Sequence, residues 1–447
     1  MVRPEVVRVG EGAGTSRAWI EPAVALATRG GLDYLCLECL AERTVALAQL
    51  ARLANPDMGY DPYLERRMRV LLQPCRENGT RLLTNAGAAN PAAAGERVLQ
   101  MARRLNLRGL RLAVVTGDDV LPLLHADLTS LETGKPLGEI AGQIVSANAY
   151  LGAEPMVAAL AEGAHVVIAG RVADPSLALA ALRHGFGWDA GDWDRLAAGI
   201  LVGHLTECGP QVTGGYFADP GRKEVPDLVN IGAPIAECHA DGTAILTKLT
   251  GTGGLVTPAT CTEQLLYEVQ DPGCYLTPDV TADFRHVRFT PAGADRVHVS
   301  GASGRPQPES LKVTVGYRDG YIGETQLSYG GAGCASRGRL AAEILRKRVE
   351  LMNLDPVETR VDVLGIDSLY GGALAPPEEP TEVRVRLAVH TRSREEADLV
   401  AGLADGLTLA GPYGGGGPSV SVREVIAVCS VLLPRATVRP AVTVREA

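Results

Sequence analysis

The chain has 447 residues, of which 46% are hydrophobic and 4% aromatic, and its formal net charge is −9. This length exceeds what one simple core fills, so we expect two domains, residues 1–240 and 241–447. The charge shows no basic run, which argues against a nucleic-acid or anionic-membrane surface and favours a small-molecule substrate.

We expect a cytoplasmic protein with reduced thiols. No apolar stretch approaches the roughly 20 residues of a membrane span, and the N-terminus leads into a strand without the apolar region of a signal peptide. Nine cysteines are scattered along the chain. Cys36 and Cys39 have the spacing of a redox or zinc pair, but no second pair follows and Cys36 lies in an apolar run, so we expect burial and no metal site.

The first half of the chain alternates between strand-like and helix-like segments. This alternation predicts an α/β fold with an open, mostly parallel sheet and crossover helices, followed by a second, α+β domain. The predicted strands are Val6–Val9, Tyr34–Leu37, Arg81–Thr84, Arg111–Val115 and His165–Ala169.

Glycines and polar residues follow these strands. The first strand leads into Gly10, Gly12 and Gly14, which predict a tight turn that meets the dinucleotide fingerprint only in part. Open α/β sheets bind ligands at the carboxyl ends of their strands. We therefore expect Gly12, Asn85, Asp118 and Arg171 to surround one cleft.

Several polar residues could bind a substrate there. Asn85, Asn90 and Asn148 could donate to a carbonyl or thioester oxygen, although Asn90 fits a helix cap equally well. Arg171 could clamp a carboxylate or phosphate, or pair with Asp174. Either Asp118 or Asp119 should cap the following helix, and the other could meet the substrate or a metal; Asp118 is our catalytic candidate.

His204, Glu207 and Cys208 bring a base, an acid and a thiol together near glycines. If residues 197–207 form a helix, His204 and Cys208 lie one turn apart with Glu207 beside them. This arrangement suits acid–base or thiol catalysis, and the structural alternative is a capped helix end whose histidine satisfies local carbonyls.

The second half carries short strand patterns at residues 244–249, 297–299, 311–317 and 382–389, and helical patterns at 336–353 and 395–407. Three glycine loops, 250–254 with Gly253, 330–333 with Gly331 and 411–417, could hold a phosphate or carboxylate, or serve only as turns. We expect the first two loops to approach the cleft. The proline-rich residues 375–380 predict a turn or linker.

Four segments carry a family resemblance: residues 147–152, 168–174, 203–209 and 276–280. Together with the opening glycine segment they are similar to the acyclic terpene utilisation (AtuA-like) family along essentially the whole chain. The resemblance implies a place in the breakdown of branched terpenoid acids through coenzyme A thioesters.

Our leading hypothesis is a homo-oligomeric enzyme that acts on a branched carboxylic acid or acyl-CoA thioester by acid–base hydration or elimination. No cofactor is assigned beyond coenzyme A as part of the substrate. A nucleotide- or dinucleotide-dependent enzyme is one alternative, with Asp33 or Glu38 as the ribose ligand. A non-catalytic assembly partner of a pathway enzyme is the other.

Overall fold

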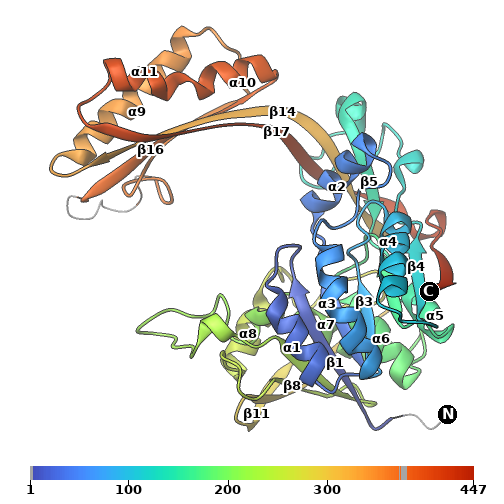
Figure 1. Cartoon of the computed structure of the whole chain (residues 1–447). Helices are drawn as coiled ribbons and strands as arrows, with labels where there is room; N and C mark the ends of the chain where they lie inside the picture. Colours follow the sequence, from blue (N-terminus) through green and yellow to red (C-terminus); the bar gives the residue numbers. More distant parts are fainter. Residues whose placement is uncertain (1–3, 372, 374–379) are drawn as a thin grey trace. The chain divides into compact units, whose positions relative to one another are not determined.

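The computed structural model describes residues 4–371, 373 and 380–447, so the predicted turn at 375–380 lies outside the described residues except for Pro380. The chain divides into two compact units, Met1–Gly316 with Val428–Ala447 and Tyr317–Ala427, here called the first and second unit (Figure 1). Residue 240, where the sequence places a domain boundary, lies in the first unit between neighbouring strands of one sheet.

The first unit is built on a large mixed sheet. Its strand order is β11-β12-β8-β7-β1-β2-β3-β6-β4-β18 in the described part of the chain. The strands are β1 (Val6–Gly14), β2 (Tyr34–Glu38), β3 (Arg81–Thr84), β4 (Arg111–Thr116), β6 (Val166–Ala169), β7 (Pro234–His239), β8 (Ala244–Lys248), β11 (Arg288–Gly293), β12 (Arg296–Ser300) and β18 (Ala441–Glu446).

The five predicted strands form the parallel centre of this sheet. β1, β2, β3, β6 and β4 pair in parallel, and β6 returns between β3 and β4. Antiparallel strands extend the sheet on both sides, β7 beside β1 and β18 beside β4. The carboxyl ends of the central strands therefore share one edge of the sheet, which confirms the predicted fold class.

Helices cover both faces of the parallel centre. The helices of this unit are α1 (Ile20–Arg29), α2 (Glu42–Ala54), α3 (Leu64–Glu77), α4 (Pro91–Arg104), α5 (Glu154–Ala161), α6 (Ser176–Phe186), α7 (Trp193–Thr206) and α8 (Pro258–Leu266), with short 3-10 turns η1 (Leu121–Leu123), η2 (Leu137–Gln143), η3 (Gly209–Gln211), η4 (Leu228–Asn230) and η5 (Arg435–Thr437). Leu35 and Leu37 of β2 pack with α1 and α3, whereas the hydroxyl of Tyr34 lies 2.6 Å from Nδ1 of His184 in α6.

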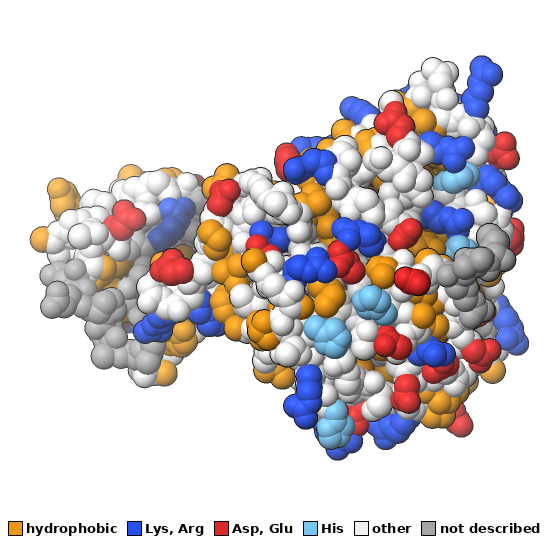
Figure 2. Space-filling view, turned by 90° about the horizontal axis from the view of Figure 1, so that it is seen from below, with side chains coloured by type: hydrophobic (Ala, Val, Ile, Leu, Met, Phe, Trp, Pro, Cys, Tyr) orange, Lys and Arg blue, Asp and Glu red, His pale blue; other side chains and the backbone are white. Residues whose placement is uncertain are grey.

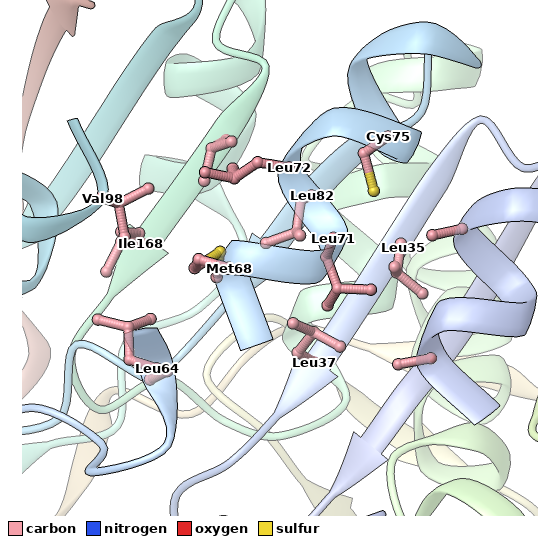
Figure 3. Close-up of a cluster of buried hydrophobic side chains, with 14 of the residues drawn as sticks. Leu35, Leu37, Leu64, Met68, Leu71, Leu72, Cys75, Leu82, Val98 and Ile168 are labelled. Carbon is pink, nitrogen blue, oxygen red and sulfur yellow. The ribbon is translucent and has the colours of Figure 1, made fainter. Parts of the chain in front are cut away.

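The main hydrophobic core lies between the sheet and α1, α3 and α4 (Figure 3). Helix α3 supplies Leu64, Met68 and Leu71, which face Leu82 of β3 and Ile168 of β6. All five are fully buried. Burial of such side chains stabilises by about 1.5–3 kcal/mol each, so this core fixes the positions of the strand ends that carry the polar residues.

Smaller elements complete the first unit. A three-stranded sheet is formed by β9 (Tyr275–Leu276), β10 (Thr281–Asp283) and β13 (Ser303–Arg305). Strand β5 (Ile144–Ala149) pairs with β14 (Ser310–Gly330). β5 was not predicted from the sequence, because Ser146 and Asn148 at its centre interrupt the apolar alternation that marks a strand.

The second unit is an antiparallel sheet packed against helices. The sheet order is β15-β16-β14-β17. The chain enters this unit along β14 and returns to the first unit along β17. Its elements are β14, β15 (Glu358–Leu364), β16 (Glu382–Thr391), β17 (Gly415–Pro434), α9 (Cys334–Leu351), α10 (Arg394–Ala401) and α11 (Leu403–Ala410). Leu327, Val385 and Leu345 belong to its buried core.

Two predictions for the second half need correction. The helix predicted at 395–407 is divided at Gly402 into α10 and α11. The glycine segment 411–417 is not a loop throughout, because β17 already begins at Gly415.

None of the helices within the described ranges is both long and apolar enough to cross a bilayer. On the face that Figure 2 shows, acidic and basic side chains are interspersed.

Candidate functional site

The glycines of the first predicted turn belong to a strand. β1 continues through Gly14 in the extended conformation, which overturns the predicted turn at Gly10, Gly12 and Gly14. A Cβ on Gly12 would lie 2.8 Å from the Cβ of Ala23, and one on Gly14 would lie 2.5 Å from the carbonyl carbon of Cys208. These glycines let the protein pack against its own backbone and leave no phosphate-binding loop at this point.

Glu38 ends β2 as a buried carboxyl group. Its Oε1 accepts from the backbone N–H of Leu40 at 2.7 Å and from Nδ2 of Asn85 at 3.0 Å. The Oδ1 of Asn85 accepts in turn from the backbone N–H of Cys39 at 2.7 Å. Asn85 therefore joins the end of β3 to the end of β2 and holds the carboxyl group of Glu38 in place.

Arg171 follows β6 and is completely buried. Its guanidinium donates to the carbonyl oxygens of Leu40, at 2.6 Å, and Val172, and it forms an ion pair with Asp174. It also lies over the ring of Tyr150, 4.5 Å from the centroid. Arg171 therefore brings a fixed positive charge to the same edge of the sheet as Glu38.

Asp118 holds the loop that carries Arg171. Its Oδ2 accepts from the backbone N–H of Arg171 and from Nδ2 of Asn148, both at 2.9 Å. Burial raises the pKa of Asp118 to about 6 even though these hydrogen bonds lower it. Asp119, not Asp118, accepts from a backbone N–H at the start of η1. Asp118 and Asn148 thus position Arg171.

His204 and Glu207 form a buried pair at the end of α7. Nδ1 of His204 lies 3.1 Å from Oε1 of Glu207, and Nε2 lies 3.2 Å from the carbonyl oxygen of Leu265. The imidazole stacks on Phe284 and contacts the ring of Tyr275. Cys208 lies beyond the end of α7, so it is not on the same helix as His204, contrary to the sequence prediction. His204 contacts Glu207 instead.

The hydrogen bonds of His204 determine how the pair holds its proton. Nε2 faces a carbonyl oxygen and must donate, so Nδ1 either accepts from a protonated Glu207 or donates to its carboxylate. Burial lowers the pKa of His204, but the hydrogen bond and charge of Glu207 outweigh it and the pKa is raised. Burial raises the pKa of Glu207 to about 7. Each side chain of the pair therefore holds a proton more tightly than it would in water.

The second oxygen of Glu207 is the unusual atom of this pair. Oε2 is buried and has no hydrogen-bond partner among the described residues. A buried carboxylate oxygen without a hydrogen-bond partner costs free energy. Such atoms are typical of sites where a ligand or a reacting group supplies the partner.

Glu11, Glu38, Asp174 and Glu207 interact electrostatically and are called here the carboxyl cluster. Burial, and then the charge of Asp174, raises the pKa of Glu38 to about 8. Burial also raises the pKa of Glu11 well above its usual range, with further contributions from Glu38 and Glu207. Repulsion between buried carboxylates favours their neutral forms, so the cluster holds protons near neutral pH.

The carboxyl cluster reaches solvent at Asp174, whose side chain is 36% exposed.

A different carboxyl group, Glu42, lies near the cluster. The hydroxyl of Tyr150 donates to Oε1 of Glu42 at 2.5 Å. Burial raises the pKa of Glu42, but this hydrogen bond and neighbouring cations bring it down to about 2. Glu42 is thus a permanent anion, in contrast to the proton-holding Glu38 and Glu207.

Cys208 does not have the surroundings of a catalytic thiolate. Burial and the charge of Glu207 raise the pKa of its thiol, whereas a nucleophilic cysteine needs a lowered pKa. Cys36 and Cys39 are fully buried, as the sequence predicted. Within residues 4–371, 373 and 380–447, no group of three His, Cys, Asp or Glu side chains is arranged to hold a metal ion.

Two of the remaining predicted residues, Asn90 and Gly253, serve the fold, and the third, Gly331, belongs to the second unit. Asn90 caps α4 through the backbone N–H of Ala93 and also donates to two carbonyls. Gly253 approaches the carbonyl oxygen of Asp227, where a Cβ could not fit. Gly331 lies in the second unit, and its backbone N–H donates to the carbonyl oxygen of Thr381.

Four residues near the carboxyl groups were not predicted in these roles: Glu11, Tyr150 and Tyr275 were not expected at the site, and Glu38 was expected only as a ribose ligand. The sequence did contain a sign of the two glutamates. Each is a charged residue in an otherwise apolar strand, and such a strand must be buried. The two tyrosines gave no such signal, since their partners are remote in sequence.

The comparisons with known proteins agree with the motifs. A family model, the acyclic terpene utilisation family protein AtuA, matches residues 7–444. No curated protein and no solved structure matches the chain. Because the family model covers nearly all 447 residues, the chain belongs to the acyclic terpene utilisation family, which implies a role in the use of acyclic terpenes.

Proposed function

We propose that the protein is a hydratase- or lyase-type enzyme that acts on a branched carboxylic acid or acyl-CoA thioester at the carboxyl cluster. The observation that supports this most is the buried, unpartnered Oε2 of Glu207, whose other oxygen contacts His204. A carboxyl group with a pKa of about 7 can both take and give a proton near neutral pH.

Addition or removal of water requires one base and one acid. In elimination, Oε2 of Glu207 takes the proton beside the thioester carbonyl. The protonated carboxyl group of Glu38, with its pKa of about 8, gives a proton to the departing hydroxyl group, so that water leaves and a double bond forms. Hydration reverses both transfers. His204 is a positioning residue that fixes the orientation of Glu207 and its proton.

Arg171 stabilises negative charge in this proposal. Its guanidinium is fixed by carbonyl oxygens and by Asp174, so it needs no rearrangement when negative charge develops on a thioester oxygen. Coenzyme A is part of the substrate and not a resident cofactor. The dinucleotide alternative loses its main support, because the glycine segment is a packed strand and Glu38 is already hydrogen-bonded.

The test combines binding and turnover. The purified full chain is mixed with 3-methylbut-2-enoyl-CoA, and hydration is followed by the loss of the ultraviolet absorbance of the conjugated thioester. Glu207→Gln should lower turnover by about 10²-fold or more while the chain stays folded. The matched control is Glu162→Gln, which changes an exposed glutamate at the end of α5.

Two outcomes contradict the proposal. Full turnover by Glu207→Gln removes Glu207 as the acid–base group. A failure of a series of branched acyl-CoA esters both to react and to raise the melting temperature removes the substrate class. A bound ligand at 100 times its Kd should stabilise the protein by about 2.7 kcal/mol, which a thermal shift detects readily.

A further inference from the structure

A cavity of about 470 Å³ lies in the first unit, and none of its lining residues belongs to the carboxyl cluster. Its wall includes Leu151, which forms a β-bridge with Val172, the residue after Arg171. The cavity is lined by three arginines and two carboxylates, and its remaining wall is largely apolar. We call it the arginine pocket and define it by Arg183, Arg435, Arg439, Glu154 and Asp279.

Arg183 is the most deeply buried of these charges. Its side chain is 8% exposed, and Nη1 pairs with Oε2 of Glu154 at 2.7 Å. Its Nε is buried without a hydrogen-bond partner among the described residues. The side chain of Glu154 is 70% exposed and therefore well solvated. This pair leaves Arg183 with an unused donor and a weakly held counter-ion.

Arg435 contacts carbonyl oxygens instead of carboxylates. Nε donates to the carbonyl oxygen of Pro308 at 3.1 Å, and Nη2 donates to that of Pro278 at 2.6 Å. Burial lowers the pKa of Arg435, and the charge of Asp279 only partly opposes this effect. The guanidinium is thus partly desolvated, and no described carboxylate forms an ion pair with it. A bound anion would supply that ionic partner.

The carboxylate of Asp279 is already engaged. Oδ1 accepts from the backbone N–H of Ala153 at 2.8 Å, and Oδ2 accepts from the hydroxyl of Ser176 at 2.6 Å. Arg439 is exposed, and its side chain makes no hydrogen bond or ion pair with a described residue. The pocket therefore carries more positive than negative charge, and two of its arginines have free donors.

The geometry points to a binding site for a monoanionic carboxylate with a short aliphatic body. The guanidinium groups of Arg183, Arg435 and Arg439 would receive the carboxylate, and Leu196, Leu311 and Val438 would contact the aliphatic part. A dianionic phosphate fits less well, because Glu154 and Asp279 stand at the same cavity. This inference does not depend on catalysis at the carboxyl cluster.

The test is calorimetric titration of the full chain with 3-methylbutanoate, acetate and inorganic phosphate. We expect 3-methylbutanoate to bind at least tenfold more tightly than acetate, since each buried methylene contributes about fourfold. Arg439→Gln should weaken 3-methylbutanoate binding about tenfold, and added salt should weaken it further. Arg183→Gln is the second variant, whose folding is checked by circular dichroism.

The matched control is Arg29→Gln. Arg29 is an exposed arginine that lines a different pocket, of about 400 Å³, beside Trp19 and Val229. This variant should bind 3-methylbutanoate as the unmodified chain does. Equal loss in Arg29→Gln and Arg439→Gln would overturn the assignment to the arginine pocket. Binding of phosphate as tight as that of 3-methylbutanoate, or no binding of the carboxylate, would overturn the proposed ligand.

Discussion

Oε1 of Glu207 lies 3.1 Å from Nδ1 of His204, while Oε2 of the same carboxyl group is buried and has no hydrogen-bond partner in the described part of the chain. One oxygen therefore fixes the protonation of the imidazole, and the other remains able to meet a ligand. The two side chains act as a unit, so changing either one changes the proton affinity of the other.

The first prediction concerns the pKa of His204. Burial lowers this pKa, whereas the hydrogen bond and charge of Glu207 raise it, with smaller contributions from the carbonyl oxygen of Leu265 and the charge of Glu268. Glu207→Gln removes the charge of Glu207, so the pKa of His204 should fall. The measurement is a titration of the histidine ring signals by nuclear magnetic resonance. An unchanged pKa in Glu207→Gln would show that the two groups are not coupled, and Glu162→Gln serves as the control.

The second prediction is a pH dependence of stability caused by Glu38. Its pKa is about 8 in the folded chain and about 4.5 when unfolded, so the folded state binds the proton more tightly. The free energy of unfolding should therefore be greatest below pH 4.5 for this group and fall as the pH rises from about 5 to 8. Each pKa unit corresponds to about 1.4 kcal/mol.

Glu38→Gln tests this pH dependence directly. Glutamine keeps the Oε1 acceptor for Leu40 and Asn85 but cannot ionise. The melting temperature of Glu38→Gln should change less between pH 5 and 8 than that of the unmodified chain, and it should be higher at pH 8. The exposed control Glu162→Gln should retain the original slope. Identical slopes for all three proteins would contradict a raised pKa at Glu38.

The sequence predicted the parallel centre of the sheet because its strands are apolar runs separated by helical patterns. Tyr34–Glu38 and Arg81–Thr84 agree with the predicted strands within one residue. The antiparallel additions were harder to predict. β18 at the C-terminus pairs with β4 across more than 300 residues, and no local pattern specifies such a partner.

The candidate site was predictable in position but not in detail. Asn85, Asp118 and Arg171 were expected at strand ends. In the structure, each forms hydrogen bonds at the edge of the sheet where the carboxyl ends of the central strands lie. The contacts that alter proton affinity could not be predicted. The pKa of Glu38 depends on a hydrogen bond from Asn85, 47 residues away, and on the charge of Asp174, which follows a third strand.

The third prediction concerns the close packing of β1 against the segment that follows α7. A Cβ on Gly14 would lie 2.5 Å from the carbonyl carbon of Cys208 and 2.7 Å from its Cα, both backbone atoms that cannot rotate away. Gly14→Ala should therefore destabilise the chain by about 1–3 kcal/mol and displace Glu207. Gly142→Ala is the control, because a Cβ there meets nothing within 4 Å.

Thermal unfolding of both glycine variants measures this effect. Gly142→Ala should lie within about 1 kcal/mol of the unmodified chain, since it removes only unfolded-state freedom. If Gly14→Ala behaved in the same way, the contact between β1 and Cys208 would not be as close as the structure has it.

The last prediction concerns Arg171, whose guanidinium donates to the carbonyl oxygens of Leu40 and Val172 and pairs with Asp174. Arg171→Met keeps the apolar stem over Tyr150 but leaves two carbonyls and a carboxylate without their donor. Each buried carbonyl oxygen left without a donor should cost about 1–3 kcal/mol, and the loss at Asp174 should be smaller because its side chain is 36% exposed. Without the positive charge, the pKa of Glu38 should rise further, because Arg171 is among the groups that lower it.

Arg171→Lys separates charge from geometry. Lysine keeps the positive charge but not the planar fork that reaches several acceptors, so we expect a loss of stability smaller than that of Arg171→Met. The control is Arg222→Lys, which changes a side chain that is 83% exposed and pairs loosely with Asp219 at 3.8 Å. Thermal unfolding should rank the variants with Arg222→Lys unchanged and Arg171→Met lowest. If both Arg171 variants matched the control, the end of β6 would not depend on this guanidinium.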